Sequence, residues 1–217
     1  MPSNQSHHKY IISLGGSLIV PDEVDIAFLR ELKNLLSHKN SQNKSFIIAP
    51  GGGRTARKYA TAAKTLGDLN RSNLDWLGIY SIRLNSLLLS SIFKKLRNVK
   101  VMDMLEAVPG RSSDFESVIF AKRYQAAHIV NLTNIDYVYD KNPKKYSDAQ
   151  PLKQISWKDF RKIVGNKWDP GLNLPFDPVA SKFAEKLKLK VIVMNGKPLA
   201  NLKNFLSGNP YRGTVIG

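Results

Sequence analysis

The stretch FIIAPGGGRTARKY, residues 46–59, decides the fold. Phe46 to Ala49 is a short apolar run that is typical of a buried strand. Three glycines follow at 51–53, and a helical pattern then runs from Arg54 to about Leu66. A strand, a glycine turn and a helix in this order aim backbone N–H groups at an anion. Because adjacent glycines let the backbone approach a phosphate closely, we predict a phosphate-binding loop here.

Three basic residues crowd the first turn of this predicted helix: Arg54, Arg57 and Lys58. The helix macrodipole disfavours cations at this end, so the placement is locally unfavourable unless an anion lies nearby. A bound phosphate would supply that anion. The alternative is a tight turn followed by solvated basic side chains.

A second strand-to-glycine loop precedes the first one in the chain. Tyr10 to Leu14 is predicted as a strand, and Gly15, Gly16 and Ser17 follow it directly. One such loop is weak evidence of a phosphate site, but two in neighbouring strands strengthen the prediction.

Strands and helices alternate along the remaining sequence. Further strands are predicted at 99–105, 128–133, 190–195 and 213–216, and helices at 25–38, 73–96, 114–126, 156–164, 177–188 and 199–207. The helix at 73–96 is expected to be largely buried, and its apolar residues could lie wholly in the core or supply a dimer face. Alternation of this kind predicts an α/β fold: a three-layer sandwich with a mostly parallel central sheet, built as a single domain.

Composition excludes some classes of protein. The chain has 217 residues, no cysteine and a formal net charge of +16. Without cysteine there are no disulfides or thiolate metal sites, which suits a cytoplasmic protein. No apolar run is long enough to cross a membrane. No nucleic-acid-binding motif accompanies the positive charge, so we expect a solvated basic surface.

Several polar residues lie where ligands bind in such folds, and each also has a structural explanation. Asp75 is in the first turn of the long helix, where the dipole favours any acid. Ser112 and Ser113 begin a helix, and Asp177 precedes Pro178, so both places suit N-capping. Thr133 ends a strand, at the edge of the sheet where open α/β folds bind ligands.

Seven segments, in this order, give the chain its likeness to one family. They are SLGGSLIVP (13–21), APGGGRTARKY (49–59), LDWLGIYSIRLNS (74–86), PGRSSD (109–114), LTNIDYVYDKNP (132–143), DPVASK (177–182) and GTVIG (213–217). With these segments the chain resembles the archaeal-type uridylate (UMP) kinases of the amino-acid kinase superfamily over nearly its whole length.

The resemblance implies an acceptor-nucleotide half (about 1–114) and an ATP half (about 115–217). The residues implied for ATP are Gly15, Gly16, Ser17, Gly53, Arg57, Thr133, Tyr139 and Asn142. Those implied for UMP are Gly52, Asp75, Val108, Pro109, Gly110, Arg111, Ser112 and Ser113. Arg57 and Asp177 are the implied catalytic residues, and no protein metal ligand is expected.

The implied activity is transfer of the γ-phosphate of ATP to UMP, giving UDP in pyrimidine nucleotide biosynthesis. Magnesium would accompany ATP. The UMP phosphate already carries a nucleophilic oxygen, so positioning and charge neutralisation suffice and no general base is needed. The resemblance also implies a cytoplasmic homo-oligomer, a hexamer, with no specific nucleic-acid or membrane partner.

The chain departs from the family pattern at a few places. Ser13 replaces a lysine of many superfamily members, Glu106-Ala107 replaces a glycine pair, Asn142 replaces an aspartate, and LNLPFDP (172–178) replaces a serine-rich loop. Two alternatives therefore stay open. One is a kinase of another small acceptor, which Asp75 disfavours because it would repel an anion. The other is a nucleotide-binding or nucleic-acid-associated protein with weak or no turnover.

Overall fold

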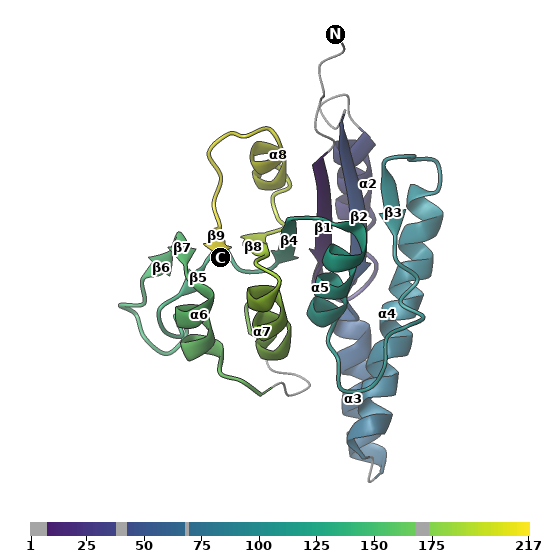
Figure 1. Ribbon diagram of the computed structural model, residues 1–217. Helices are drawn as coiled ribbons and strands as arrows, with labels where there is room; N and C mark the ends of the chain where they lie inside the picture. Colours follow the sequence, from purple (N-terminus) through teal and green to yellow (C-terminus); the bar gives the residue numbers. More distant parts are fainter. Residues whose placement is uncertain (1–7, 38–42, 68–69, 168–173) are drawn as a thin grey trace.

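One seven-stranded sheet runs through the structure, in the order β3-β2-β1-β4-β8-β9-β7 (Figure 1). The computed structural model describes residues 8–37, 43–67, 70–167 and 174–217. The strands of this sheet are β1 (His8–Leu14), β2 (Lys44–Pro50), β3 (Val99–Val101), β4 (His128–Thr133), β7 (Gln154–Ile155), β8 (Lys190–Asn195) and β9 (Thr214–Ile216). Two short strands, β5 (Val138–Tyr139) and β6 (Pro151–Leu152), pair separately and antiparallel.

The five strands from β3 to β8 in this order are parallel to their neighbours. Among the described strands of this sheet, only β9 pairs antiparallel with its neighbour β8, and β7 pairs parallel with β9. The predicted mostly parallel sheet is therefore confirmed. Because β1 lies between β2 and β4, the carboxyl ends of these three strands come together at one edge of the sheet.

Helices cover both faces of the sheet. They are α1 (Gly16–Ile19), α2 (Ile26–Ser37), α3 (Gly53–Leu66), α4 (Arg71–Phe93), α5 (Ser113–Tyr124), α6 (Trp157–Val164), α7 (Pro178–Lys186) and α8 (Ala200–Leu206). Successive strand residues point to opposite faces. Accordingly, Ile11 packs in the core with α5, α6 and α7, whereas Ile12 packs in a second core with α2 and α8. The predicted three-layer sandwich is confirmed.

Two predicted elements differ from the structure. The strand expected at 99–105 ends at Val101. It stops because the Asp103 carboxylate accepts a hydrogen bond from the Leu105 N–H, at 3.1 Å, and because Met104 has a positive φ of 58°. The helix expected to be largely buried is α4, and one of its faces is instead exposed and apolar.

The helices α3 and α4 form a hairpin that extends past the end of the sheet (Figure 1). No residue of α3 is buried, although the two helices pack against each other. The exposed face of α4 carries a row of large apolar side chains, Trp76, Tyr80, Leu84 and Leu87. Among the described helices, none is long and apolar enough to span a bilayer.

The two predicted glycine loops meet at the carboxyl ends of β1 and β2. A Cβ atom on Gly16 would lie 2.1 Å from the backbone nitrogen of Gly53, and one on Gly53 would lie 2.3 Å from the carbonyl oxygen of Gly16. Gly53 also has a positive φ of 65°, which L side chains rarely adopt. The loops therefore touch through their backbones, and any side chain at these positions would push them apart.

This contact predicts opposite effects for two glycine substitutions. Gly16→Ala should destabilise the protein by about 3 kcal/mol or more, because its methyl group would collide with backbone atoms. Gly78→Ala is the matched control. It lies inside α4, and no described neighbour comes within 4 Å of the place its methyl group would take, so it should stabilise the helix by roughly 0.5–1 kcal/mol. Urea denaturation measures the free energy of unfolding of both variants. Equal stability of the Gly16→Ala variant and the native chain would contradict the close contact.

Candidate active site

Backbone hydrogen bonds hold each glycine loop to the neighbouring strand. The Gly15 N–H donates to the carbonyl of Leu132 in β4 at 2.8 Å, and the Gly51 N–H donates to the carbonyl of Leu14 in β1 at 2.9 Å. Thr133 lies beside Gly15, since a Cβ atom added to Gly15 would lie 3.6 Å from the Thr133 Cα. The loops Gly15–Ser17 and Gly51–Gly53 and the end of β4 thus form one continuous edge.

Asn85 of α4 holds the second glycine loop, Gly51–Gly53, in place. Its buried side-chain amide donates to the Gly51 carbonyl at 2.8 Å and lies 3.4 Å from the Gly52 carbonyl. In the sequence this residue is only a polar interruption of an apolar helix face. Sequence reasoning therefore missed its role of holding the loop.

The three basic residues in the first turn of α3 have two different partners. Arg54 and Lys58 both pair with Asp22, at 3.4 Å and 2.7 Å, on the protein surface. Asp22 is thus an anion supplied by the chain itself, which the sequence did not reveal. Arg57 instead donates to the Ser17 hydroxyl of the first glycine loop, at 3.1 Å. Of the three cations, Arg57 is the one directed to the predicted phosphate loops.

The loop 108–113 is joined to α4 at a predicted UMP residue. The Gly110 N–H donates to the Asp75 carboxylate at 2.8 Å, and Gly110 has a positive φ of 85°. Val108 and Pro109 lead into this turn, and Arg111 follows it. The structure thus brings Asp75 together with the loop that the resemblance assigns to the same nucleotide.

The end of this loop begins helix α5. Ser112 is the N-cap, and its hydroxyl accepts the Phe115 N–H at 3.2 Å. Ser113 is the first helical residue. The capping explanation is thus correct for Ser112 but not for Ser113. The N-terminus of α5 lies at the same edge as the glycine loops, beside Ser13.

A partly buried carboxylate that the sequence analysis did not single out lies at the centre of this edge. Asp114 accepts hydrogen bonds from the Ser13 hydroxyl at 3.1 Å and from the Asp177 N–H at 3.0 Å. Burial and then the charge of Asp177 raise the pKa of the Asp114 carboxyl to about 7. In the sequence Asp114 looks like an ordinary acid in the first turn of a helix. Its contacts show that it connects β1, α5 and the start of α7.

Asp177 acts as the N-cap of α7. Its carboxylate accepts the Ala180 N–H at 2.6 Å, and Pro178 occupies the first turn. The side chain is buried, and burial raises its pKa against the hydrogen bonds from Ala180 and Ser112. The capping explanation is therefore correct, while the catalytic role stays a prediction.

The remaining predicted ATP residues lie farther along the chain. Tyr139 is in β5, and the neighbouring Val138 N–H donates to the Thr214 hydroxyl at 2.8 Å. Asn142 forms a local turn in which its side chain accepts the Lys144 N–H at 2.9 Å. Among the described residues, no hydrogen bond or ion pair joins Tyr139 or Asn142 to the glycine loops.

The departures at Ser13 and Glu106 also have partners in the structure. The Ser13 hydroxyl donates a hydrogen bond to Asp114, and Glu106 forms a surface ion pair with Arg123 at 2.6 Å. The Glu106 carboxylate is therefore neutralised by the chain itself. Its effect on a nearby phosphate would be smaller than the sequence suggested.

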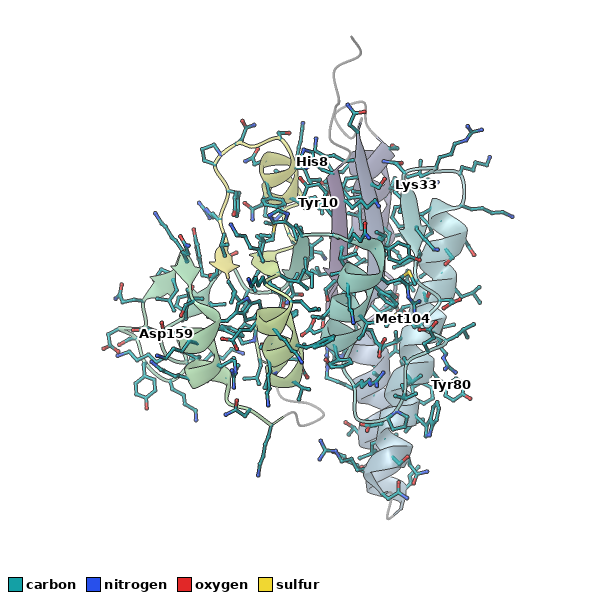
Figure 2. All side chains as sticks on the ribbon, viewed as in Figure 1. His8, Tyr10, Lys33, Tyr80, Met104 and Asp159 are labelled. Atoms are coloured by element: carbon teal, nitrogen blue, oxygen red, sulfur yellow. The ribbon has the colours of Figure 1, made fainter. Side chains whose placement is uncertain are left out.

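This geometry suits a group that carries several negative charges. The helices α3 and α5 begin at the edge where β1 and β2 end, and α7 begins next to Asp114. Helix N-termini offer free N–H groups and a positive dipole end to phosphates. Arg57 adds a full positive charge at the same place. The opposite end of the sheet holds His8 and Tyr10 of β1 (Figure 2).

Comparison with known proteins identifies the family. The model of the Amino acid kinase family matches residues 103–195. A uridylate kinase of Thermoplasma volcanium is 33% identical, with 97% of this chain and 98% of that protein aligned. The chain belongs to the uridylate kinase family. Another member, from Methanococcus aeolicus, is 32% identical, with 96% of this chain and 99% of that protein aligned.

Solved structures agree with membership of the uridylate kinase family. The crystal structure of uridylate kinase from Archaeoglobus fulgidus has a TM-score of 0.78 and 29% identity, covering 96% of this chain and 100% of that one. UMP kinase from Ureaplasma parvum has a TM-score of 0.80 at 18% identity, covering 97% and 98%, and so supports the fold alone.

The raised pKa of Asp114 predicts how stability depends on pH. A carboxyl whose pKa rises on folding stabilises the folded state below its ordinary pKa, near 3.8, and loses that contribution as pH rises through about 7. The native chain should therefore lose stability relative to Asp114→Asn between pH 5 and 8. The difference in Tm should change by roughly 5–10 °C over this range.

Calorimetry of both proteins at several pH values measures this difference. Glu116 also has a raised pKa, but both proteins contain it and its effect largely cancels in the comparison. Asp177 interacts directly with Asp114, so the pH-dependent difference reports on this pair of carboxyls. A Tm difference that does not vary with pH would show that Asp114 keeps an ordinary pKa.

Proposed function

We propose that this protein transfers the γ-phosphoryl group of ATP to UMP and releases UDP and ADP. The observation that carries this proposal is the contact of the two glycine loops beside Arg57, within a chain of the uridylate kinase family. Two loops that meet through their backbones can hold two phosphate groups close together. Phosphoryl transfer requires that proximity above all else.

The reaction needs little chemistry from the protein. A phosphate oxygen of UMP attacks the γ-phosphorus of ATP, the bond from that phosphorus to the bridging oxygen breaks, and ADP leaves. Since the nucleophile is already an anion, the chain has to reduce charge repulsion rather than remove a proton. Backbone N–H groups of the glycine loops, the helix N-termini and the Arg57 guanidinium are the groups available for this.

We assign to the individual residues the roles that the family resemblance implies. On the acceptor side, Gly52, Asp75 and the loop 108–113 would hold UMP, with Asp75 close enough to the loop to bind the ribose as the loop closes. On the donor side, Gly15, Gly16, Ser17 and Gly53 would lie along the ATP phosphates. Thr133, Tyr139 and Asn142 would bind the nucleoside part of ATP.

Magnesium would enter as the MgATP complex. Within the described ranges, no three His, Asp or Glu side chains lie close enough together to hold a metal ion. Mg²⁺ in phosphoryl-transfer sites keeps several water ligands and binds mainly to the substrate phosphates. This coordination fits a site whose own groups are chiefly N–H donors and an arginine.

A coupled assay of ADP release tests this function directly. With ATP and magnesium present, UMP should support turnover, whereas CMP, AMP and a reaction without acceptor should support much less. Turnover with another small phosphate but not with UMP would replace the acceptor in this proposal. No turnover with any acceptor, despite measurable binding of UMP, would favour a binding protein.

In the same assay, Arg57→Ala should lower kcat/KM at least about 100-fold, the typical cost of losing one transition-state contact. Lys58→Ala is the matched control, because Lys58 is the next residue on α3 but pairs with Asp22 at the surface. Its kcat/KM should stay within about threefold of the native value, as expected for a surface ion pair. Similar losses in both variants would argue that general positive charge, and not Arg57, assists the reaction.

We also propose that the protein is a homo-oligomer whose subunits pack through α4. Trp76, Tyr80, Leu84 and Leu87 are 38%, 63%, 60% and 67% exposed and lie on one side of the helix. Figure 2 shows Tyr80 on the outer side of α4. The Arg83 guanidinium lies over the rings of Trp76 and Tyr80 and so adds to the surface. A contiguous row of exposed large apolar side chains is typical of a protein–protein interface.

Disruption of this stripe should lower the molecular mass in solution. Leu84→Glu combined with Leu87→Glu would place four carboxylates in a two-fold interface, and should shift the assembly to smaller species as measured by light scattering. Ile163→Glu is the control, because Ile163 is a 38% exposed apolar residue on α6. An unchanged mass for the α4 variant would exclude this helix as the main interface.

A further inference from the structure

Glu116 is a buried acid with an unfulfilled hydrogen-bonding atom. It lies in the first turn of α5, and its side chain is only 4% exposed. Its Oε1 atom has no hydrogen-bond partner among the residues that the structure describes. Buried carboxylates are normally paired or hydrogen-bonded, because their transfer out of water is costly. A role for Glu116 should therefore involve the cation nearest to it.

That cation is Arg111, in the loop 108–113. The Arg111 Nη1 atom lies 3.9 Å from the Glu116 Oε1 atom, which is within ion-pair range but too long for a hydrogen bond. The guanidinium also lies over the ring of Phe115, 5.0 Å from its centroid. Two neighbours on the first turn of α5 thus hold one side of this arginine. The Arg111 side chain as a whole is 46% exposed.

The other charged residues around Glu116 form an ion pair with each other. Arg123 binds Glu106 at 2.6 Å on the surface. Burial raises the pKa of Glu116, as does Glu106, whereas Arg111 and Arg123 lower it. Arg111 is therefore the partner on which the charge of Glu116 chiefly depends, and Glu116 in turn is the acid with which Arg111 forms its ion pair.

We propose that Glu116 is a positioning residue that orients the Arg111 guanidinium toward the phosphate of the acceptor nucleotide. This inference rests on the proposed function, in which the loop 108–113 closes on UMP. The closure would shorten the 3.9 Å separation to a charge-assisted hydrogen bond. Glu116 itself would not touch the substrate.

The geometry of an arginine makes this arrangement useful. A guanidinium has five N–H donors in a rigid plane, so a carboxylate on one edge leaves the opposite edge free for a phosphate. The Phe115 ring fixes the plane, and Glu116 fixes the rotation within that plane. A long side chain that is held in this way loses less conformational freedom when the substrate binds.

Glu116→Gln tests the proposal because it keeps the shape and removes the charge. Calorimetric titration of UMP in the absence of ATP should give a Kd about fivefold to tenfold higher than that of the native protein, which corresponds to the loss of one oriented charged contact. The Tm should stay unchanged or rise, because a buried charge without full hydrogen bonding has been removed. Weaker binding with undiminished stability separates positioning from a purely structural role.

A double-variant comparison checks that the effect passes through Arg111. Arg111→Ala should weaken UMP binding more than Glu116→Gln does, and the two changes together should weaken it no further than Arg111→Ala alone. Glu106→Gln is the control, since its carboxylate pairs with Arg123 at the surface, and it should leave the Kd within about twofold.

The results that overturn the inference differ from those that overturn the function. An unchanged UMP affinity in Glu116→Gln, or effects of Glu116→Gln and Arg111→Ala that simply add, would refute positioning by Glu116 even if the native enzyme makes UDP. Absence of turnover in the native protein would refute the function, while the Kd values still report on Glu116. If the native protein does not bind UMP, both are overturned.

Discussion

Gly16 and Gly53 approach each other more closely than any pair of side chains would permit, at the point where β1 and β2 end. Each later feature of the site is built on this contact. The Gly15 and Gly51 N–H groups bind the adjacent strands, and α3 begins directly at Gly53 with Arg57 one turn further on. The parallel sheet brings the two loops side by side, and the missing Cβ atoms let them touch. Two phosphate groups can then share one region of N–H donors.

Beneath these donors the chain places acids, not further cations. Asp114 and Asp177 lie at the N-termini of α5 and α7. Asp177 is buried and Asp114 is partly buried. They satisfy N–H groups within the fold and join β1 to the two helices through Ser13 and Asp114. Their raised pKa values reflect what this arrangement costs in desolvation. The site therefore combines acids whose hydrogen bonds are made within the fold with N–H donors that face outward.

The sequence predicted the arrangement of elements better than the partners of individual side chains. Apolar runs and glycine turns located β1, β2 and α3 to within a few residues, because these signals are local. The predicted anion for Arg54 and Lys58 proved to be Asp22, which lies in a loop whose path only the fold defines. Asn85 and Asp114 were missed for the same reason: their contacts span 34 and 101 residues of chain. Whether the long helix would lie wholly in the core or supply a dimer face stayed open, because leucines and aromatic residues look alike in sequence whether they meet a core or another surface.

One helix connects the loop 108–113 to the second glycine loop. Asp75 contacts the loop 108–113 and Asn85 holds the Gly51–Gly52 backbone, and both belong to α4. A helix rises by about 1.5 Å per residue and resists stretching, so the interval between the two contacts is set by residue count. The loop 108–113 and the second glycine loop are thus tied to one stiff element, and a displacement of α4 would move both loops together.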